Sequence, residues 1–244
     1  MMTEEIDDFR KTLMPAIWIF AIAFIFLMAF KITHEKIFGV NIFLPVPAID
    51  SVSMTIFNKI QHDLLPNNIK ILITDPVHAL LVQVNISLFF AFLISLPIFL
   101  FRLTKYLNPA LHKNEQEVLA TFALPSAILF IIGSAIGYAF LVPAILRLLN
   151  FYTTVLNATT YYEINKFVSF VILFTFLSGV AFTLPVFMKL SVRFGVNKSF
   201  WSKNIKYVLI LILAISFVLT PDLTTMLLVS GVLLSLYALG YYLS

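Results

Sequence analysis

The sequence predicts an all-α integral membrane protein with six transmembrane helices. Of its 244 residues, 61% are hydrophobic and only 11% are charged, whereas soluble domains carry roughly 25% charged residues. Lipid can cover apolar side chains on the outside of a helical bundle, so the missing polar coat favours a membrane protein. The apolar residues also gather into long runs, and we expect a single membrane domain over residues 1–244.

Four apolar runs are long enough to span the bilayer, since a span needs about 20 mainly apolar residues. They cover residues 13–30, 79–101, 118–149 and 167–188. Two further runs, 205–219 and 223–243, are separated only by Thr220, Pro221 and Asp222. Because proline stops a helix, these two runs predict a tight hairpin made of a short fifth span and a sixth span.

The basic residues predict the orientation of the spans. An even number of spans puts both termini on one side, and Lys and Arg concentrate on the inner side of a membrane. With the N-terminus inside, ten of the 16 basic residues lie on the inner side: Arg10, Lys11, Arg102, Lys105, Lys113, Lys189, Arg193, Lys198, Lys203 and Lys206. We therefore expect both termini inside, and we assign the net charge of +4 to orientation rather than to nucleic acid.

The long outer connection after the first span contains two candidate amphipathic segments, residues 49–60 and 68–73, which are bounded by prolines. We expect these segments to lie on the outer surface as an extracytoplasmic cap. Prolines also fall inside the predicted spans, at Pro97, Pro125, Pro143 and Pro185. Proline kinks a helix, so the spans predict a bundle with a concave face.

The residues give no support for an enzyme, a cofactor or a metal site. The chain has no cysteine, which excludes disulfides and thiolate metal sites. Its four histidines, His34, His62, His78 and His112, have no second ligand at helical spacing, so we interpret them as solvated loop residues. No catalytic or phosphate-binding motif is present in the sequence.

Polar and small residues within the spans predict helix packing. Gln83, Asn85 and Thr183 are expected to form interhelical hydrogen bonds, because unpaired polar groups are costly in lipid. Gly133 and Gly137 are spaced as small residues that let two helix backbones approach closely.

Three carboxylates leave alternatives open. Asp222, between the last two spans, could cap the sixth helix through its backbone N–H groups or contact a partner. Glu115 and Glu117, in the predicted inner loop near Lys105 and Lys113, could accept a charge-assisted pair from an incoming arginine. From the residues alone, we favour the alternative that they are solvated acids near the positive end of a helix.

Four segments in series resemble TatC, the multispanning subunit of the twin-arginine protein translocase. They read ISLPIFLFRLTKYLNPALHKNE, GSAIGYAFLVP, FVSFVILFTFLSGVAFTLPV and KNIKYVLILILAISFVLTPD. The resemblance implies a non-catalytic receptor that binds twin-arginine signal peptides of folded precursors at its cytoplasmic face. It also implies that export is driven by the proton gradient, in a cell membrane that is prokaryotic or, alternatively, organellar.

The resemblance further implies particular site residues. Asp8 and Glu115 match the carboxylates that meet the signal arginines, and Arg10 matches the arginine of the N-terminal motif. Thr183, where the family usually carries Glu or Gln, matches the contact with small single-span subunits of the TatA and TatB type. Pro185 and Asp222 are expected beside this contact, with the equivalence of Asp222 open by one position. A homo- or hetero-oligomer follows from such partners.

A small-solute secondary transporter is the alternative function. It would require broken helices related by an inverted repeat, with polar substrate groups at the middle of the membrane. We detect no repeat and no charged residue in the middle of the first five spans.

Overall fold

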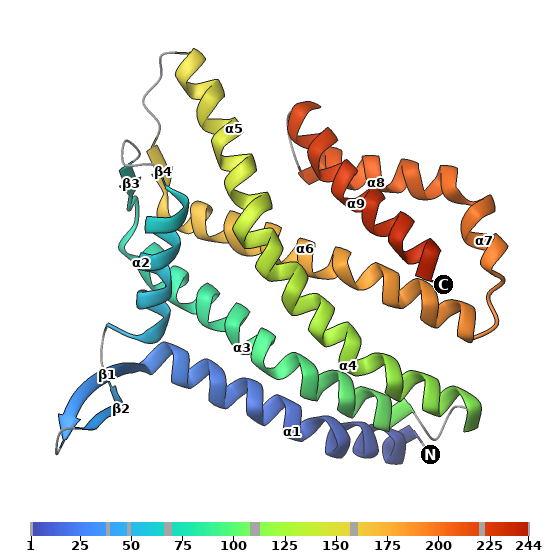
Figure 1. Ribbon diagram of the computed structural model, residues 1–244. Helices are drawn as coiled ribbons and strands as arrows, with labels where there is room; N and C mark the ends of the chain where they lie inside the picture. The colour runs from blue at the N-terminus through green and yellow to red at the C-terminus, as the bar shows by residue number, and fades with distance from the viewer. Residues whose placement is uncertain are drawn as a thin grey trace. The chain divides into compact units, whose positions relative to one another are not determined.

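The computed structural model describes residues 2–37, 40–47, 50–65, 70–107, 113–156, 161–219 and 223–243, and long helices dominate it (Figure 1). Within this part of the chain, four helical stretches are long and apolar enough to cross a membrane: Phe9–Ala29, Pro76–Leu107, Phe122–Val155 and Ile164–Arg193. They coincide with the first four predicted spans. The full elements are α1 (Met2–Ala29), α3 (Pro76–Leu107), α4 (Lys113–Ile136), α5 (Val142–Val155) and α6 (Ile164–Arg193).

The last two predicted spans are helices with the predicted bounds, α8 (Ile205–Leu219) and α9 (Leu223–Leu243), and they pack against each other. A short helix, α7 (Lys198–Lys203), precedes them. The 15 residues of α8 give a length of about 22 Å, short of the roughly 30 Å hydrocarbon core. The six-span count and the orientation therefore stay predictions. The predicted turn at Pro221 and Asp222 lies outside the described residues.

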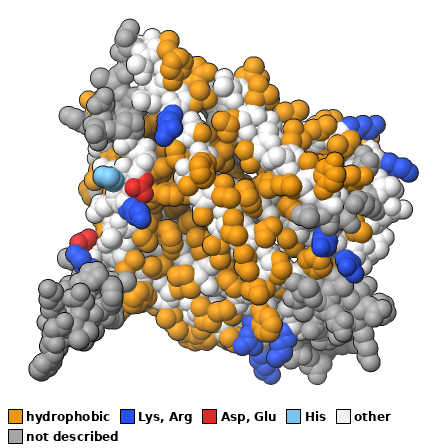
Figure 2. Space-filling view, in the orientation of Figure 1, with side chains coloured by type: hydrophobic (Ala, Val, Ile, Leu, Met, Phe, Trp, Pro, Cys, Tyr) orange, Lys and Arg blue, Asp and Glu red, His pale blue; other side chains and the backbone are white. Residues whose placement is uncertain are grey.

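Hydrophobic side chains cover much of the face seen in Figure 2. On α1, for example, Ile17, Trp18, Ile22 and Ile25 are all more than half exposed. A helix that exposes so many large apolar side chains is unsuited to water but suited to contact with lipid.

The third span is not one continuous α-helix. Residues Gly137–Leu141 form a π-helix between α4 and α5, and the N–H of Val142 donates to the carbonyl of Gly137. Pro143 follows directly. Its ring lacks an N–H and would clash with the carbonyl four residues earlier in an α-helix, and the wider π-turn is a common way to absorb such a disruption.

Two small sheets correct the all-α prediction for the described residues. Strands β1 (Phe30–Ile37) and β2 (Val40–Pro47) pair antiparallel, with Phe30 opposite Pro47. Strands β3 (Lys70–Leu72) and β4 (Tyr161–Glu163) pair in parallel. The amphipathic segment predicted at 68–73 is thus a strand at 70–72. Three residues cannot offset the cost of starting a helix, whereas β4 supplies hydrogen-bond partners for their backbone.

The other predicted amphipathic segment is a helix, α2 (Val52–Leu64), shifted a few residues along the chain. Its buried residues are Ser53, Phe57, Ile60 and Leu64. The spacing of three or four residues places them on one face, as an amphipathic helix requires. The position of α2 on the outer membrane surface, as a cap over a concave bundle, stays a prediction.

The chain divides into two compact units. The first comprises Met1–Phe99 and Asn150–Leu173, and the second comprises Leu100–Leu149 and Phe174–Ser244. In the second unit, Met188 of α6, Ile212 of α8 and Tyr237 of α9 form a buried cluster, against which Trp201 of α7 packs.

Glycines allow α4 and the π-helix to approach α6 closely within the second unit. A Cβ added to Gly133 would lie 2.5 Å from the Cβ of Phe182, and one added to Gly137 would lie 2.5 Å from the Cβ of Ser178. The hydroxyl of Ser178 also donates to the carbonyl of Gly133 at 2.9 Å. The predicted packing role of Gly133 and Gly137 is confirmed.

Candidate functional site

The residues predicted to meet a signal peptide lie near the starts of two helices. Asp8 and Arg10 belong to α1, and Glu115 is the third residue of α4. The Arg10 side chain is exposed. The side chains of Asp8 and Glu115 lie outside the described residues. The backbone of α4 nevertheless places Glu115 in a first turn, where the helix dipole favours a negative charge.

Thr183 and Pro185 lie on α6. The Thr183 hydroxyl donates to the carbonyl of Val180, three residues earlier in the same helix, at 2.7 Å. The expected interhelical hydrogen bond of Thr183 is therefore wrong, because its short side chain reaches its own backbone. Pro185 is buried, and its Cα would lie 3.0 Å from a Cβ added to Gly240 of α9. Pro185 of α6 thus packs against α9 within the chain.

A cavity of about 350 Å³ opens beside this part of α6. Side chains of α6, α8 and α9 line it, together with Leu141 and with Trp201 of α7, and nearly all of them are apolar. The polar groups at its wall are already bonded, since the Ser178 hydroxyl donates to Gly133 and the Tyr237 hydroxyl to the carbonyl of Trp201. The wall therefore favours an apolar occupant.

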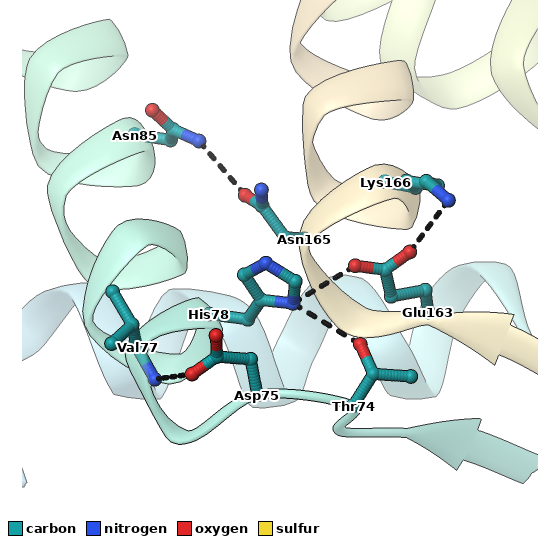
Figure 3. Close-up of polar contacts among 8 residues, drawn as sticks. All are labelled: Thr74, Asp75, Val77, His78, Asn85, Glu163, Asn165 and Lys166. Carbon is teal, nitrogen blue, oxygen red and sulfur yellow. Dashed lines mark hydrogen bonds and ion pairs between the residues drawn. The ribbon is translucent and has the colours of Figure 1, made fainter.

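A polar cluster occupies the first unit where α3 and α6 begin (Figure 3). The Glu163 carboxylate lies between His78 and Lys166: its Oε1 is 2.9 Å from Nδ1 of His78, and its Oε2 is 2.8 Å from Nζ of Lys166. The Thr74 hydroxyl lies 3.3 Å from the same His78 nitrogen. The hydrogen bond from Lys166, followed by the nearby positive charges, lowers the pKa of Glu163 below its usual value.

The start of α3 and the β3–β4 pairing position the residues of this cluster. Asp75 accepts the N–H of Val77 at 2.9 Å and so caps α3, and Pro76 occupies the first helical position, where a missing N–H costs nothing. This fixed start places His78 in the first turn of α3. The β3–β4 pairing brings Glu163, the last residue of β4, to the same place.

Two amides extend the polar contacts along α3. Asn85 donates to the Oδ1 of Asn165 on α6 at 3.2 Å. Gln83 donates to the carbonyl of Met28 on α1 at 2.7 Å and to the hydroxyl of Ser51, just before α2, at 2.9 Å. The predicted interhelical hydrogen bonds of Gln83 and Asn85 are confirmed.

The interpretation of His78 as a solvated loop residue is wrong. It lies in α3 with only 26% of its side chain exposed, because Glu163 and Thr74 cover it. His62 is 91% exposed but sits in α2 rather than in a loop. His112 and the side chain of His34 lie outside the described residues. Two signals in the sequence point to the cluster: the Asp75–Pro76 helix start, and the Glu163–Lys166 spacing of three residues at the start of a span.

Comparison with known proteins decides the family. The family model described as Sec-independent protein translocase protein (TatC) matches residues 4–231. This chain belongs to the TatC family. The TatC of Cenarchaeum symbiosum (strain A) is 29% identical over 243 residues, covering 98% of this chain and 92% of that protein. The TatC of Aquifex aeolicus (strain VF5) is 28% identical over 177 residues, covering 72% of this chain and 74% of that protein.

A solved structure shares the fold. The crystal structure of a twin-arginine translocase receptor, TatC, superposes with a TM-score of 0.74 at 22% identity, over 98% of this chain and 97% of that one. The mostly helical, apolar architecture of this chain is thus the TatC architecture. Family and helices together make it a multi-pass membrane protein of Tat protein transport.

Proposed function

We propose that this chain is the receptor subunit of a twin-arginine translocase and binds the twin-arginine signal peptides of folded precursor proteins at its cytoplasmic face. The observation that carries the proposal is the TatC family match over residues 4–231. The match favours this function over a small-solute transporter.

The proposed binding residues are Asp8, Arg10 and Glu115. A carboxylate can accept two parallel N–H bonds from a planar guanidinium, whereas the ammonium of lysine is a point charge without that geometry. Hydrogen bonds to a charged group contribute about 1.5–3 kcal/mol each. Glu115 lies in the first turn of α4, where the helix dipole favours a negative charge. Carboxylates that recognise arginine in this way would discriminate a twin-arginine from a twin-lysine signal.

The proposed partners are single-span subunits of the TatA and TatB type, which would contact the chain around Thr183, Pro185 and Asp222 in a homo- or hetero-oligomer of the cell membrane. We infer that transport draws on the proton gradient. The absence of a phosphate-binding loop from the sequence agrees with this inference.

Photocrosslinking of a twin-arginine signal peptide to the full chain in membrane vesicles tests the proposal. Glu115→Ala should abolish the crosslink. Glu117→Ala is the matched control, because it removes the same charge two residues further along the same helix, and it should retain the crosslink. Equal crosslinking in the two variants would overturn the assignment of Glu115.

A further inference from the structure

The cavity beside α6 holds about 350 Å³ and is lined almost wholly by apolar side chains of α6, α8 and α9. It suits an apolar group. Its wall offers no free polar partner at Ser178 or Tyr237, since both hydroxyls are bonded to backbone carbonyls.

Exposed cations lie next in the sequence to residues that line the cavity near the end of α6. Met188 and Trp201 line the cavity, and the neighbouring side chains Lys189, Arg193 and Lys203 are exposed. Lys206 is also exposed and lies 5.2 Å from the ring centroid of Tyr207. We call Lys189, Arg193, Lys203 and Lys206 the basic rim.

No acidic residue accompanies the basic rim in the sequence, because residues 164–221 contain neither Asp nor Glu. Orientation in the membrane explains an excess of Lys and Arg. It does not explain why the cations neighbour cavity-lining residues in the sequence.

We propose that the cavity and the basic rim together bind one anionic phospholipid of the surrounding bilayer. One acyl chain fills the cavity between α6, α8 and α9, and the phosphate lies among the cations of the basic rim. Basic pockets between membrane helices are suited to anionic headgroups, and Trp and Tyr side chains such as Trp201 and Tyr207 favour the same interfacial level. The proposal does not depend on signal-peptide binding.

Trp201 makes the proposal testable by fluorescence, because it lines the cavity. The chain has two tryptophans, and Trp18→Phe changes the exposed one to leave Trp201 as the sole reporter. The Trp18→Phe chain is reconstituted in phosphatidylcholine vesicles that contain a small fraction of a lipid with brominated acyl chains. This brominated lipid is either phosphatidylglycerol or phosphatidylcholine. Bromine quenches an adjacent indole. Brominated phosphatidylglycerol should quench Trp201 several-fold more than brominated phosphatidylcholine at the same mole fraction.

Replacing the four residues of the basic rim by Gln should reduce quenching by phosphatidylglycerol to the phosphatidylcholine level. The control variant, Arg102→Gln with Lys105→Gln, removes two cations near the end of α3 and should keep the preference. In the chain with an intact basic rim, equal quenching by the two lipids would by itself overturn the proposal. A preference that survives loss of the basic rim would overturn it as well.

Discussion

Nδ1 of His78 lies 2.9 Å from Oε1 of Glu163, and this contact joins the first turn of α3 to the strand that leads into α6. Lys166 holds the second carboxylate oxygen at 2.8 Å. The carboxylate therefore links two segments that are far apart in the sequence, and its removal should loosen the start of both helices.

Glu163→Gln should lower the thermal unfolding midpoint of the purified chain at neutral pH. Because the folded state lowers the pKa of Glu163, the stabilisation is present above the ordinary carboxyl pKa of about 4.3 and is lost as the pH falls through the folded value. The difference between parent and variant should therefore shrink as the pH is lowered from 7 to 3. A difference that stays constant over this range would argue against an ionic role.

Gln83→Ala should destabilise the first unit, because the Gln83 amide bonds both Met28 and Ser51. Hydrogen bonds between membrane helices average about 0.6 kcal/mol, so the loss of two should cost roughly 1 kcal/mol. Ser235→Ala is the control, since its exposed hydroxyl bonds only its own helix at Val232. Denaturant unfolding in mixed micelles measures both variants, and an equal loss in the two would contradict the bridging role of Gln83.

Gly133→Ala should cost roughly 1–3 kcal/mol, because the new Cβ would overpack against Phe182 and the carbonyl of Ser178. Gly231→Ala is a matched control on α9, where an added Cβ meets nothing within 4 Å. That change should be neutral or stabilising by about 0.5–1 kcal/mol, since alanine favours a helix over glycine. The thermal unfolding midpoint should fall for Gly133→Ala and stay unchanged or rise for Gly231→Ala, and equal destabilisation of the two variants would contradict the close approach.

Thr183→Gln should increase crosslinking to a single-span partner subunit several-fold, because the longer amide can reach beyond the Val180 carbonyl that now binds the Thr183 hydroxyl. Thr154→Gln is the control on α5, where the threonine hydroxyl likewise bonds its own helix at Asn150. Unchanged crosslinking by Thr183→Gln would remove Thr183 from the partner contact.

The helices could be predicted from the sequence because their signals are local. Runs of apolar residues locate the spans, and Pro76 and the Thr220–Asp222 separation lie at helix ends. The bounds of α8 and α9 follow directly from these signals. The sequence also carries a local signal for the hairpin of β1 and β2. The two eight-residue strands are separated by only two residues, one of which is Gly39.

The polar cluster could not be located in the same way, because the contacts that bring α3 and α6 together, unlike the Glu163–Lys166 pair, are not local. His78 contacts Glu163, and Asn85 contacts Asn165. These segments are brought together by the pairing of β3 with β4, which involves three residues of each strand. No periodicity in either segment specifies its partner. The spacing of Gly133 and Gly137 predicted close packing, but the partner residues on α6 depend on how the helices cross.

Binding of a twin-arginine signal peptide to the purified full chain, compared with a twin-lysine peptide of otherwise identical sequence, is the most direct test of the proposed function. Fluorescence anisotropy of the labelled peptides measures both affinities. Bidentate recognition by carboxylates predicts at least a tenfold preference for arginine, equivalent to about 1.4 kcal/mol. Equal affinity for the two peptides would contradict the proposal that this chain is a twin-arginine receptor.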